Sequence, residues 1–346
     1  MKNNVKMQDI ADALGISKVS VSNALAGRYG VSQELRHKIE KTAVAMGYHY
    51  RHVESMACYS IGVIVSSRFV AKGESFYWEM YWELVSFLKM RGSATVFEMI
   101  KPDDEEQMIL PVSLTSGKCD ALIVIGKLDT SYLELMEKSF HIPIVLLDNY
   151  NNDSKLDCVV STGYLGMYQM TEYLIQRGHS KIAFVGSIHG SSSITDRFFG
   201  YCRALTVHEI PYREDWILND RNLDTGDIVI QDLPDEMPTA FACNCDLTAY
   251  ELMRKLTGKG YRVPDDISIV GFDNYAKNQY YPIGVTTYAV NIRLMAESAA
   301  NRVFQKLDKI ADECDRIQIV PGEIIEKDSV KDISTFASRE GSYSNQ

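Results

Sequence analysis

The stretch VKMQDIADALGISKVSVSNAL, residues 5–25, predicts two short helices joined by a tight turn. In its first half, Ile10 and Leu14 recur at the four-residue spacing of one helix face. Gly15 suits the left-handed residue at which a helix stops, and the hydroxyl of Ser17 can cap the helix that follows. We therefore expect a helix–turn–helix pair at the start of the chain.

The second helix of this pair has two chemically different faces. Its apolar face carries Val21, Ala24 and Leu25. The opposite face and its edges are small or polar, and we predict that they contact DNA through Ser17, Lys18, Val19, Ser20, Ser22 and Asn23. Side chains of this size can approach base edges in the major groove, and Ser, Asn and Lys donate hydrogen bonds to bases and phosphates. An ordinary helical hairpin with a solvated face is the alternative.

A third helix is expected directly after the pair. Ser32 can cap it, and Gly47 ends it. Between them, apolar and small residues recur at helical spacing: Leu35, Ile39, Thr42, Ala43 and Met46. The segments MQDIADALGISKVSVSNALAG and VSQELRHKIEKTAVAMGY together resemble the N-terminal DNA-binding domain of the lactose-repressor (LacI) family of bacterial transcription regulators. The resemblance implies a helix-turn-helix DNA-binding domain over residues 1–49.

Residues 50–60 are expected to form a short hinge or linker. In the LacI family this segment usually carries a hinge helix that inserts an apolar side chain into the minor groove. Val53 and Met56 are the candidates for that side chain. The segment is shorter than the usual family hinge, so a protein without an ordinary hinge helix is the alternative.

Charge and composition favour a basic head on an acidic body. Residues 1–57 carry eight Lys and Arg and five Asp and Glu, a net charge of +3, whereas the chain has −10 and its remainder therefore −13. A length of 346 residues predicts two or three domains. Residues 1–6 are polar and no long apolar run follows, so neither a secretory signal nor a membrane span is expected. Seven scattered cysteines favour a reducing cytoplasm.

From residue 61 onward, short apolar runs alternate with amphipathic stretches. The predicted strands are 61–66, 94–99, 120–126, 142–148, 158–161, 181–186, 239–243, 267–272 and 316–321. Such runs are typical of strands buried on both faces of a parallel sheet. Residues 164–176 and 247–256 are amphipathic helical stretches between them. The pattern predicts a doubly wound α/β architecture with too many strands for one small sheet, and hence two lobes.

The body resembles the effector domain of the LacI family and the periplasmic sugar-binding proteins. The resemblance is carried by segments such as VVSTGYLGMYQMTEYLIQRGHSKIAFVG and TAFACNCDLTAYELMRKLTGKGYRVPDDISIVGFDN. It implies two Rossmann-like lobes of the periplasmic-binding-protein-like type I fold over residues 61–332, before a disordered tail at 333–346. Lobe one would take about 61–161 and 291–319, and lobe two about 162–290 and 320–332. The ligand would lie in the cleft between them.

Candidate effector-binding residues follow from this resemblance. Arg197 in SSSITDR and Asp273 in VGFDN match residues that hold ligand groups in the family. A guanidinium fork suits hydroxyl or carboxylate groups. Asp246 in CNCD is a further candidate, and Asp148 at a strand end is another. The alternative for each is a surface salt bridge or a helix cap.

Aromatic residues gather after the first predicted strand. Phe76, Tyr77, Trp78, Tyr81 and Trp82 can include a stacking platform for a sugar ring, for which Phe76 is the chosen candidate. Their helical spacing also fits a core or a subunit interface. Where many relatives carry an aromatic residue that stacks on the effector, this chain has Asn222.

The sequence contains no signature of an enzyme. It has no G-x-G-x-x-G after a strand, P-loop, G-x-S-x-G elbow or H-E-x-x-H motif. Cys243 and Cys245 are expected to be a structural pair on one strand face, because a metal site needs more ligands. No catalytic residue, cofactor or metal is therefore expected.

The resemblance predicts a cytoplasmic, homodimeric transcription regulator. We expect a repressor that binds double-stranded, pseudo-palindromic operator DNA and is controlled by a small molecule, a sugar or sugar derivative. A cytosolic sugar-binding protein, or an α/β enzyme without a DNA role, is the alternative.

Overall fold

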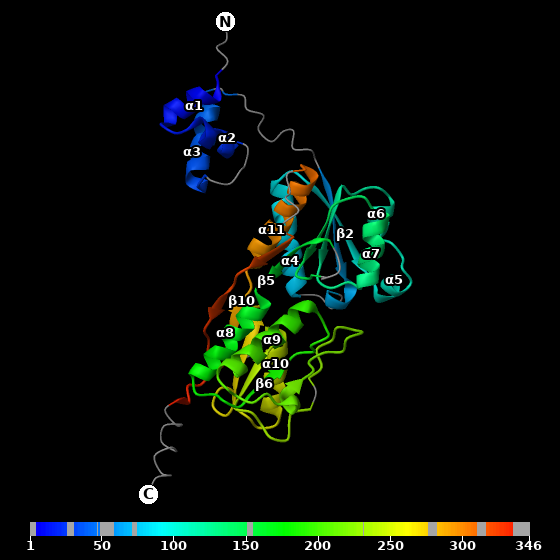
Figure 1. Ribbon diagram of the computed structural model, residues 1–346, viewed down its shortest axis with the longest axis vertical. Helices are drawn as coiled ribbons and strands as arrows, with labels where there is room; N and C mark the ends of the chain where they lie inside the picture. Colours follow the sequence, from blue (N-terminus) through cyan, green and yellow to red (C-terminus); the bar gives the residue numbers. More distant parts are fainter. Residues whose placement is uncertain are drawn as a thin grey trace. The chain divides into compact units, whose positions relative to one another are not determined.

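The computed structural model describes residues 5–25, 31–46, 48, 59–70, 75–150, 155–230, 232–275, 282–309 and 316–334 (Figure 1). The chain divides into two compact units, residues 1–58 and 59–346, which are considered separately. The predicted hinge side chains of Val53 and Met56 lie outside the described residues, as does the tail from residue 335.

The head consists of three helices, α1 (Met7–Leu14), α2 (Lys18–Leu25) and α3 (Gln33–Ala45). Gly15 ends α1 with a φ of 66°, in the left-handed region that glycine adopts without strain. The hydroxyl of Ser17 accepts the N–H of Ser20 at 3.0 Å, so it caps α2 as predicted. The three helices bury one small apolar core, made of Ile10, Ala11, Val21, Ala24, Ile39 and Ala43.

Lobe one of the body is built on a parallel six-stranded sheet in the order β11-β5-β4-β3-β1-β2. Its strands are β1 (Ser60–Ser66), β2 (Ala94–Ile100), β3 (Ala121–Ile125), β4 (Ile144–Leu147), β5 (Asp157–Ser161) and β11 (Ile317–Val320). Its helices are α4 (Phe76–Met90), α5 (Pro102–Glu106), α6 (Val112–Thr115), α7 (Thr130–Ser139) and α11 (Ile292–Leu307), with the 3-10 turn η1 (Ser67–Phe69). In Figure 1, α4 and α11 cover one face of the sheet and α5, α6 and α7 lie on the other.

Lobe two contains a second six-stranded sheet, in the order β12-β10-β9-β8-β6-β7. Its strands are β6 (Ile182–Val185), β7 (Ile217–Leu218), β8 (Ala240–Cys243), β9 (Ser268–Asp273), β10 (Thr286–Ala289) and β12 (Glu323–Ile325), of which only the last pairs antiparallel. Helices α8 (Gly163–Gln176) and α9 (Ser192–Val207) pack on one face, and α10 (Asp246–Gly258) with η2 (Glu214–Trp216) on the other.

Both lobes therefore have the predicted doubly wound α/β architecture, with apolar layers on each side of a mostly parallel sheet. The nine predicted strands are all present, with ends within two residues of the predictions. The chain passes between the lobes after β5, after β10 and after β11. In parallel sheets the carboxyl ends of the strands open onto the loops that follow them, and this is where a ligand cleft is expected.

Candidate functional sites

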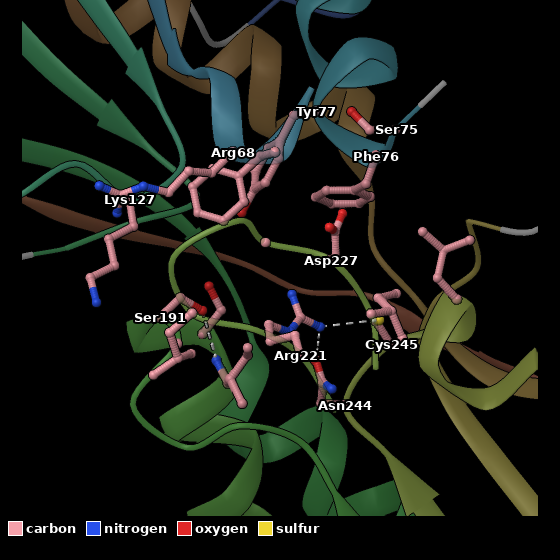
Figure 2. Close-up of a pocket in the computed structure, with 18 of the residues that line it drawn as sticks. Arg68, Ser75, Phe76, Tyr77, Lys127, Ser191, Arg221, Asp227, Asn244 and Cys245 are labelled. Carbon is pink, nitrogen blue, oxygen red and sulfur yellow. Dashed lines mark hydrogen bonds between the residues drawn. The ribbon is translucent and has the colours of Figure 1, made fainter. Parts of the chain in front are cut away.

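A cavity of about 480 Å³ lies between the two lobes of the body (Figure 2). Lobe one contributes the loops after β1, β3 and β4 and the start of α4, and lobe two contributes the loops after β6, β7, β8 and β9. The volume lies within the range of small-molecule sites. The carboxyl ends of strands from both sheets thus form the wall of one cleft.

Four of the five predicted effector residues line this cavity: Arg197, Asp273, Asp148 and Phe76. Arg197 projects from α9 and is only 5% exposed. Its Nη1 donates to the carbonyl of Asn244 at 2.7 Å, and its guanidinium lies 4.0 Å from the centre of the Phe272 ring. These contacts hold the fork in one orientation.

Asp148 follows β4 with a φ of 60°, a left-handed conformation that is uncommon outside glycine. The phenol of Tyr77 donates to its Oδ2 at 3.1 Å. Burial raises the pKa of Asp148 to about 6, although the positive charge of Arg197 and the Tyr77 hydrogen bond oppose the shift. The carboxyl of Asp148 is buried, and it can accept a hydrogen bond in either protonation state.

Asp273 is the last residue of β9 and also has a positive φ, 92°. Its Oδ1 accepts the N–H of Tyr275 at 2.8 Å. Burial raises the pKa of Asp273 to about 7, against the effects of that hydrogen bond and of the Arg197 charge. Strained backbone of this kind at the end of a strand is common in ligand sites.

Asp246 lies behind the cavity wall and is not one of the residues that line it. It is fully buried in the first turn of α10, packed so closely on Gly271 that a side chain there would overlap its carboxyl. Burial, and then the charge of Asp273, raise the pKa of Asp246 well above 3.8. Asp246 is therefore a neighbour of Asp273 behind the wall, and it does not line the cavity.

The aromatic segment after β1 divides between two roles. Phe76 and Tyr77 line the cavity, at the amino end of α4. Trp78 and Tyr81 instead pack on Phe97 of β2, with ring centres 5.2 and 4.7 Å away. Trp82 faces outward and is 64% exposed. Of the five aromatic residues, only Phe76 and Tyr77, in the first turn of α4, are therefore placed to form the predicted stacking platform.

Asn222 lines the cavity but shapes its own loop. Its side-chain oxygen accepts the N–H groups of Asp224 and Thr225 at 2.8 and 3.1 Å. The carboxamide oxygen of Asn222 is therefore already used within its own turn.

Arg221 was not among the predicted site residues, yet it is a principal cation of the cavity wall (Figure 2). Its Nε and Nη2 donate to Oδ1 and Oδ2 of Asp220 at 3.0 and 2.7 Å. Burial alone raises the pKa of Asp220, but Arg221, Thr248 and the Ser187 amide lower it to about 2. The sequence signal for Arg221 was an Asp-Arg pair shortly after a strand. That strand, β7, is only two residues long and was not predicted.

Cys243 and Cys245 do not form the expected pair on one strand. Cys243 is buried in β8, whereas Cys245 lies beyond the strand, where its Sγ accepts the N–H of Thr248 and caps α10. The chain turns from strand to helix between them, which separates their roles. Within the described ranges, no three metal-ligating side chains converge on a common point.

The head presents a second candidate site, on α2. Val21 and Ala24 are buried in the head core, while Val19 is 67% exposed. Ser17 and Lys18 are also exposed, and the remaining predicted DNA contacts are partly exposed: Ser20, Ser22 and Asn23. An apolar side chain flanked by hydroxyl, amide and ammonium donors can contact both thymine methyl groups and polar base edges.

None of the described helices is long and apolar enough to span a bilayer.

Comparison with known proteins matches both parts of the chain. Residues 6–50 match the family described as "Bacterial regulatory proteins, lacI family", and residues 171–330 match "Periplasmic binding protein-like domain". The HTH-type transcriptional repressor PurR of Vibrio atlanticus (strain LGP32) is 27% identical over 336 residues, covering 95% of this chain and 99% of that protein. The probable HTH-type transcriptional repressor ExuR of Bacillus subtilis (strain 168) is 25% identical over 342 residues, covering 96% and 100%.

Solved structures show the same fold. The lac repressor dimer bound to operator and the anti-inducer ONPF is 22% identical, with a TM-score of 0.65 over 95% of this chain and all of that one. The complex of the transcriptional regulator CelR with cellobiose is 19% identical, with a TM-score of 0.66 over 94% and 100%. A regulator from Enterococcus faecium with bound ribose is 21% identical, with a TM-score of 0.65 over 79% and 99%.

Proposed function

The chain belongs to the lacI family of bacterial regulatory proteins, and we propose that it is a transcriptional repressor whose affinity for operator DNA is controlled by a small molecule bound between the lobes of its body. Full-length relatives named as repressors support this role. They are regulators rather than enzymes, and we assign this chain no catalytic activity. Because its target is chromosomal DNA, its place is the bacterial cytoplasm.

The single observation that carries the DNA role is the exposed face of α2. Val19 projects into solvent while Val21 anchors the helix in the head core. We assign direct base contact to Val19 and Asn23, and phosphate or base contact to Ser17, Lys18, Ser20 and Ser22. Val53 and Met56, in the predicted hinge, are the candidates for insertion into the minor groove.

The effector side rests on the cavity between the lobes. Asp148 and Asp273 supply acceptors, Arg197 supplies a fixed fork of donors, and Phe76 supplies a ring face. Hydroxyl groups need acceptors and donors at fixed positions, and a pyranose ring stacks on an aromatic face. Relatives solved with ribose and cellobiose support a sugar or sugar derivative as the ligand class.

Control of DNA binding follows from linkage. A ligand changes operator affinity only if it binds two body states with different affinity. The lobes contact each other beside the cavity, where Lys127 donates to the carbonyl of His189 at 3.3 Å and Tyr150 donates to Asp196 at 2.8 Å. Opening or closing this boundary is the change that a ligand would bias. A homodimer, as in the lac repressor structure, would place two heads on a two-fold-symmetric operator.

Selection of binding sites from a random DNA pool tests the proposal. We expect the full-length protein to enrich a two-fold-symmetric site when the salt concentration is held fixed, since affinity for DNA depends on salt. Val19→Ala with Asn23→Ala should change the preferred bases, whereas Lys259→Gln, an exposed substitution in the body, should not. A site preference that is identical for the double variant and the wild type would remove the base-contact assignment.

Catalytic turnover is the outcome that would favour the alternative of an α/β enzyme. Incubation of the protein with each sugar that it binds, followed by product analysis, is expected to return the sugar unchanged. A protein that enriches no DNA site but binds a sugar would instead be a sugar-binding protein.

A further inference from the structure

Cationic side chains reach the cavity from both lobes. They are Arg68 and Lys127 from lobe one, and Arg197 and Arg221 from lobe two. The carboxylates on the same wall are Asp148, Asp227 and Asp273. Burial raises the pKa of two of these three carboxyls toward the neutral range. Of the four cations, Arg221 is paired with Asp220 and Arg68 with Glu105, whereas Arg197 and Lys127 have no ion pair among the described residues.

The buried guanidinium of Arg197 has no direct carboxylate partner among the described residues. Its one strong hydrogen bond is to a backbone carbonyl, that of Asn244, and its Nε has no partner. A buried charge is costly unless an opposite charge or several hydrogen bonds compensate it. Asp148 and Asp273 attract it only from a distance.

Arg221 lies next to Arg197 on the same wall. Its Nη2 lies 3.3 Å from the side-chain oxygen of Asn244, the residue whose backbone carbonyl accepts from Arg197. Asp220 engages Nε and Nη2 of Arg221, and this pair fixes the plane of the guanidinium. Figure 2 shows this guanidinium facing the cavity between Ser191 and Cys245.

Lys127 adds a further positive charge from the other lobe. Its ammonium group donates to the backbone carbonyl of His189. The cavity thus has two adjacent guanidinium groups on one wall and an ammonium group on the opposite lobe. An oxyanion in the cavity can gain charge-assisted hydrogen bonds from these cationic groups.

Resting on the proposed function, we propose that the effector is an acidic sugar derivative whose carboxylate or phosphate binds Arg221 and Arg197. The hydroxyl groups of the same molecule then bind Asp148 and Asp273. A neutral sugar would leave the buried charge of Arg197 without an anionic partner, whereas Arg221 already has Asp220.

Calorimetry with matched ligands tests this inference on the full-length protein. The panel consists of glucose, glucuronate and glucose 6-phosphate, with galactose, galacturonate and galactose 6-phosphate beside them. We expect at least one acid to bind at least about tenfold more tightly than its neutral parent, because hydrogen bonds between charged groups are the stronger ones. The uronate and phosphate arms identify which oxyanion the site takes.

Arg221→Lys is the diagnostic variant, since it keeps the charge beside Asp220 but loses the fork. It should weaken binding of the preferred acid by about tenfold or more, with little effect on the neutral sugar. Asp220→Asn with Arg221→Met removes the pair together and should abolish the preference for the acid, which covers the case in which the single variant folds poorly. Lys259→Gln, an exposed lysine at the end of α10, is the matched control.

Operator binding measured on the same samples separates the two ideas. If the protein binds a selected operator but no acid binds more tightly than its neutral parent, the inference is wrong and the repressor role stands. Equal affinity of wild type and Arg221→Lys for the preferred acid would also overturn it. If no DNA site is bound, the proposed function itself fails.

Discussion

Replacing Asp148 by Asn should stabilise the body relative to the wild type. This gain in stability should be larger at alkaline pH than at acidic pH. Asp148 is 4% exposed, and burial raises its pKa from 3.8 to about 6. Between these two values the unfolded chain has lost the proton that the folded chain retains. The folded state thus binds more protons, and wild-type stability falls as the pH rises.

The magnitude follows from the two pKa values. From 3.8 to about 6, at about 1.4 kcal/mol for each pH unit, the full cost of ionising Asp148 in the folded body is about 3 kcal/mol. About 2 kcal/mol of this falls between pH 4.5 and pH 8, because the unfolded carboxyl is already largely ionised at the lower pH. The neutral amide in the Asp148→Asn variant carries no such cost, and its oxygen can still accept from Tyr77.

Urea denaturation followed by tryptophan fluorescence provides the assay. All three tryptophans, Trp78, Trp82 and Trp216, belong to the body, so the signal reports its unfolding and not that of the head. The difference in unfolding free energy between Asp148→Asn and the wild type should grow by about 2 kcal/mol from pH 4.5 to pH 8. Asp235→Asn, at an exposed position, should show no such growth. A difference that is the same at both pH values would refute the reasoning.

Three further predictions concern packing, charge and capping. Gly200→Ala should destabilise the body by about 1–3 kcal/mol in urea, because its Cβ would overlap the backbone of Tyr164, whereas Gly258→Ala, which meets open space, should be neutral or stabilising. Asp220→Asn should cost about 3 kcal/mol at pH 7 by leaving Arg221 buried without its partner. This difference in unfolding free energy should shrink as the pH falls from about 4 to about 2, because the wild-type carboxyl is then protonated. A difference that stays constant over this range in the same urea titration would contradict the Asp220–Arg221 ion pair. Ser17→Ala should lower the stability of α2 by about 1 kcal/mol, seen as faster amide hydrogen exchange in that helix, and unchanged exchange would count against the cap.

Local patterns were sufficient for most of the architecture. Strands buried on both faces must be apolar along their whole length, so runs such as 121–125 and 144–147 were recognisable in the sequence. The helix–turn–helix was recognisable because Gly15 and Ser17 are required by backbone geometry within a few residues. Strand β10 lacked such a signal, because its TTYA sequence is half polar.

The candidate cavity was predictable only in part. The family resemblance pointed to Arg197 and Asp273, and both line the cavity with Asp148 and Phe76. It also pointed to Asp246, which the structure places behind the wall. The direction of that side chain depends on how α10 starts after Cys245, and no pattern of residue types specifies it.

Arg221 illustrates what sequence patterns could not supply. Its orientation depends on Asp220, which is held by Thr248 and the Ser187 amide from elements far away in the chain. Secondary structure, the two-lobe division and the DNA-binding head depend on periodicity and local turn chemistry, and a linear sequence carries both. Which charges meet in the cleft depends on how separate strand ends and helix starts come together, and this is settled by long-range packing.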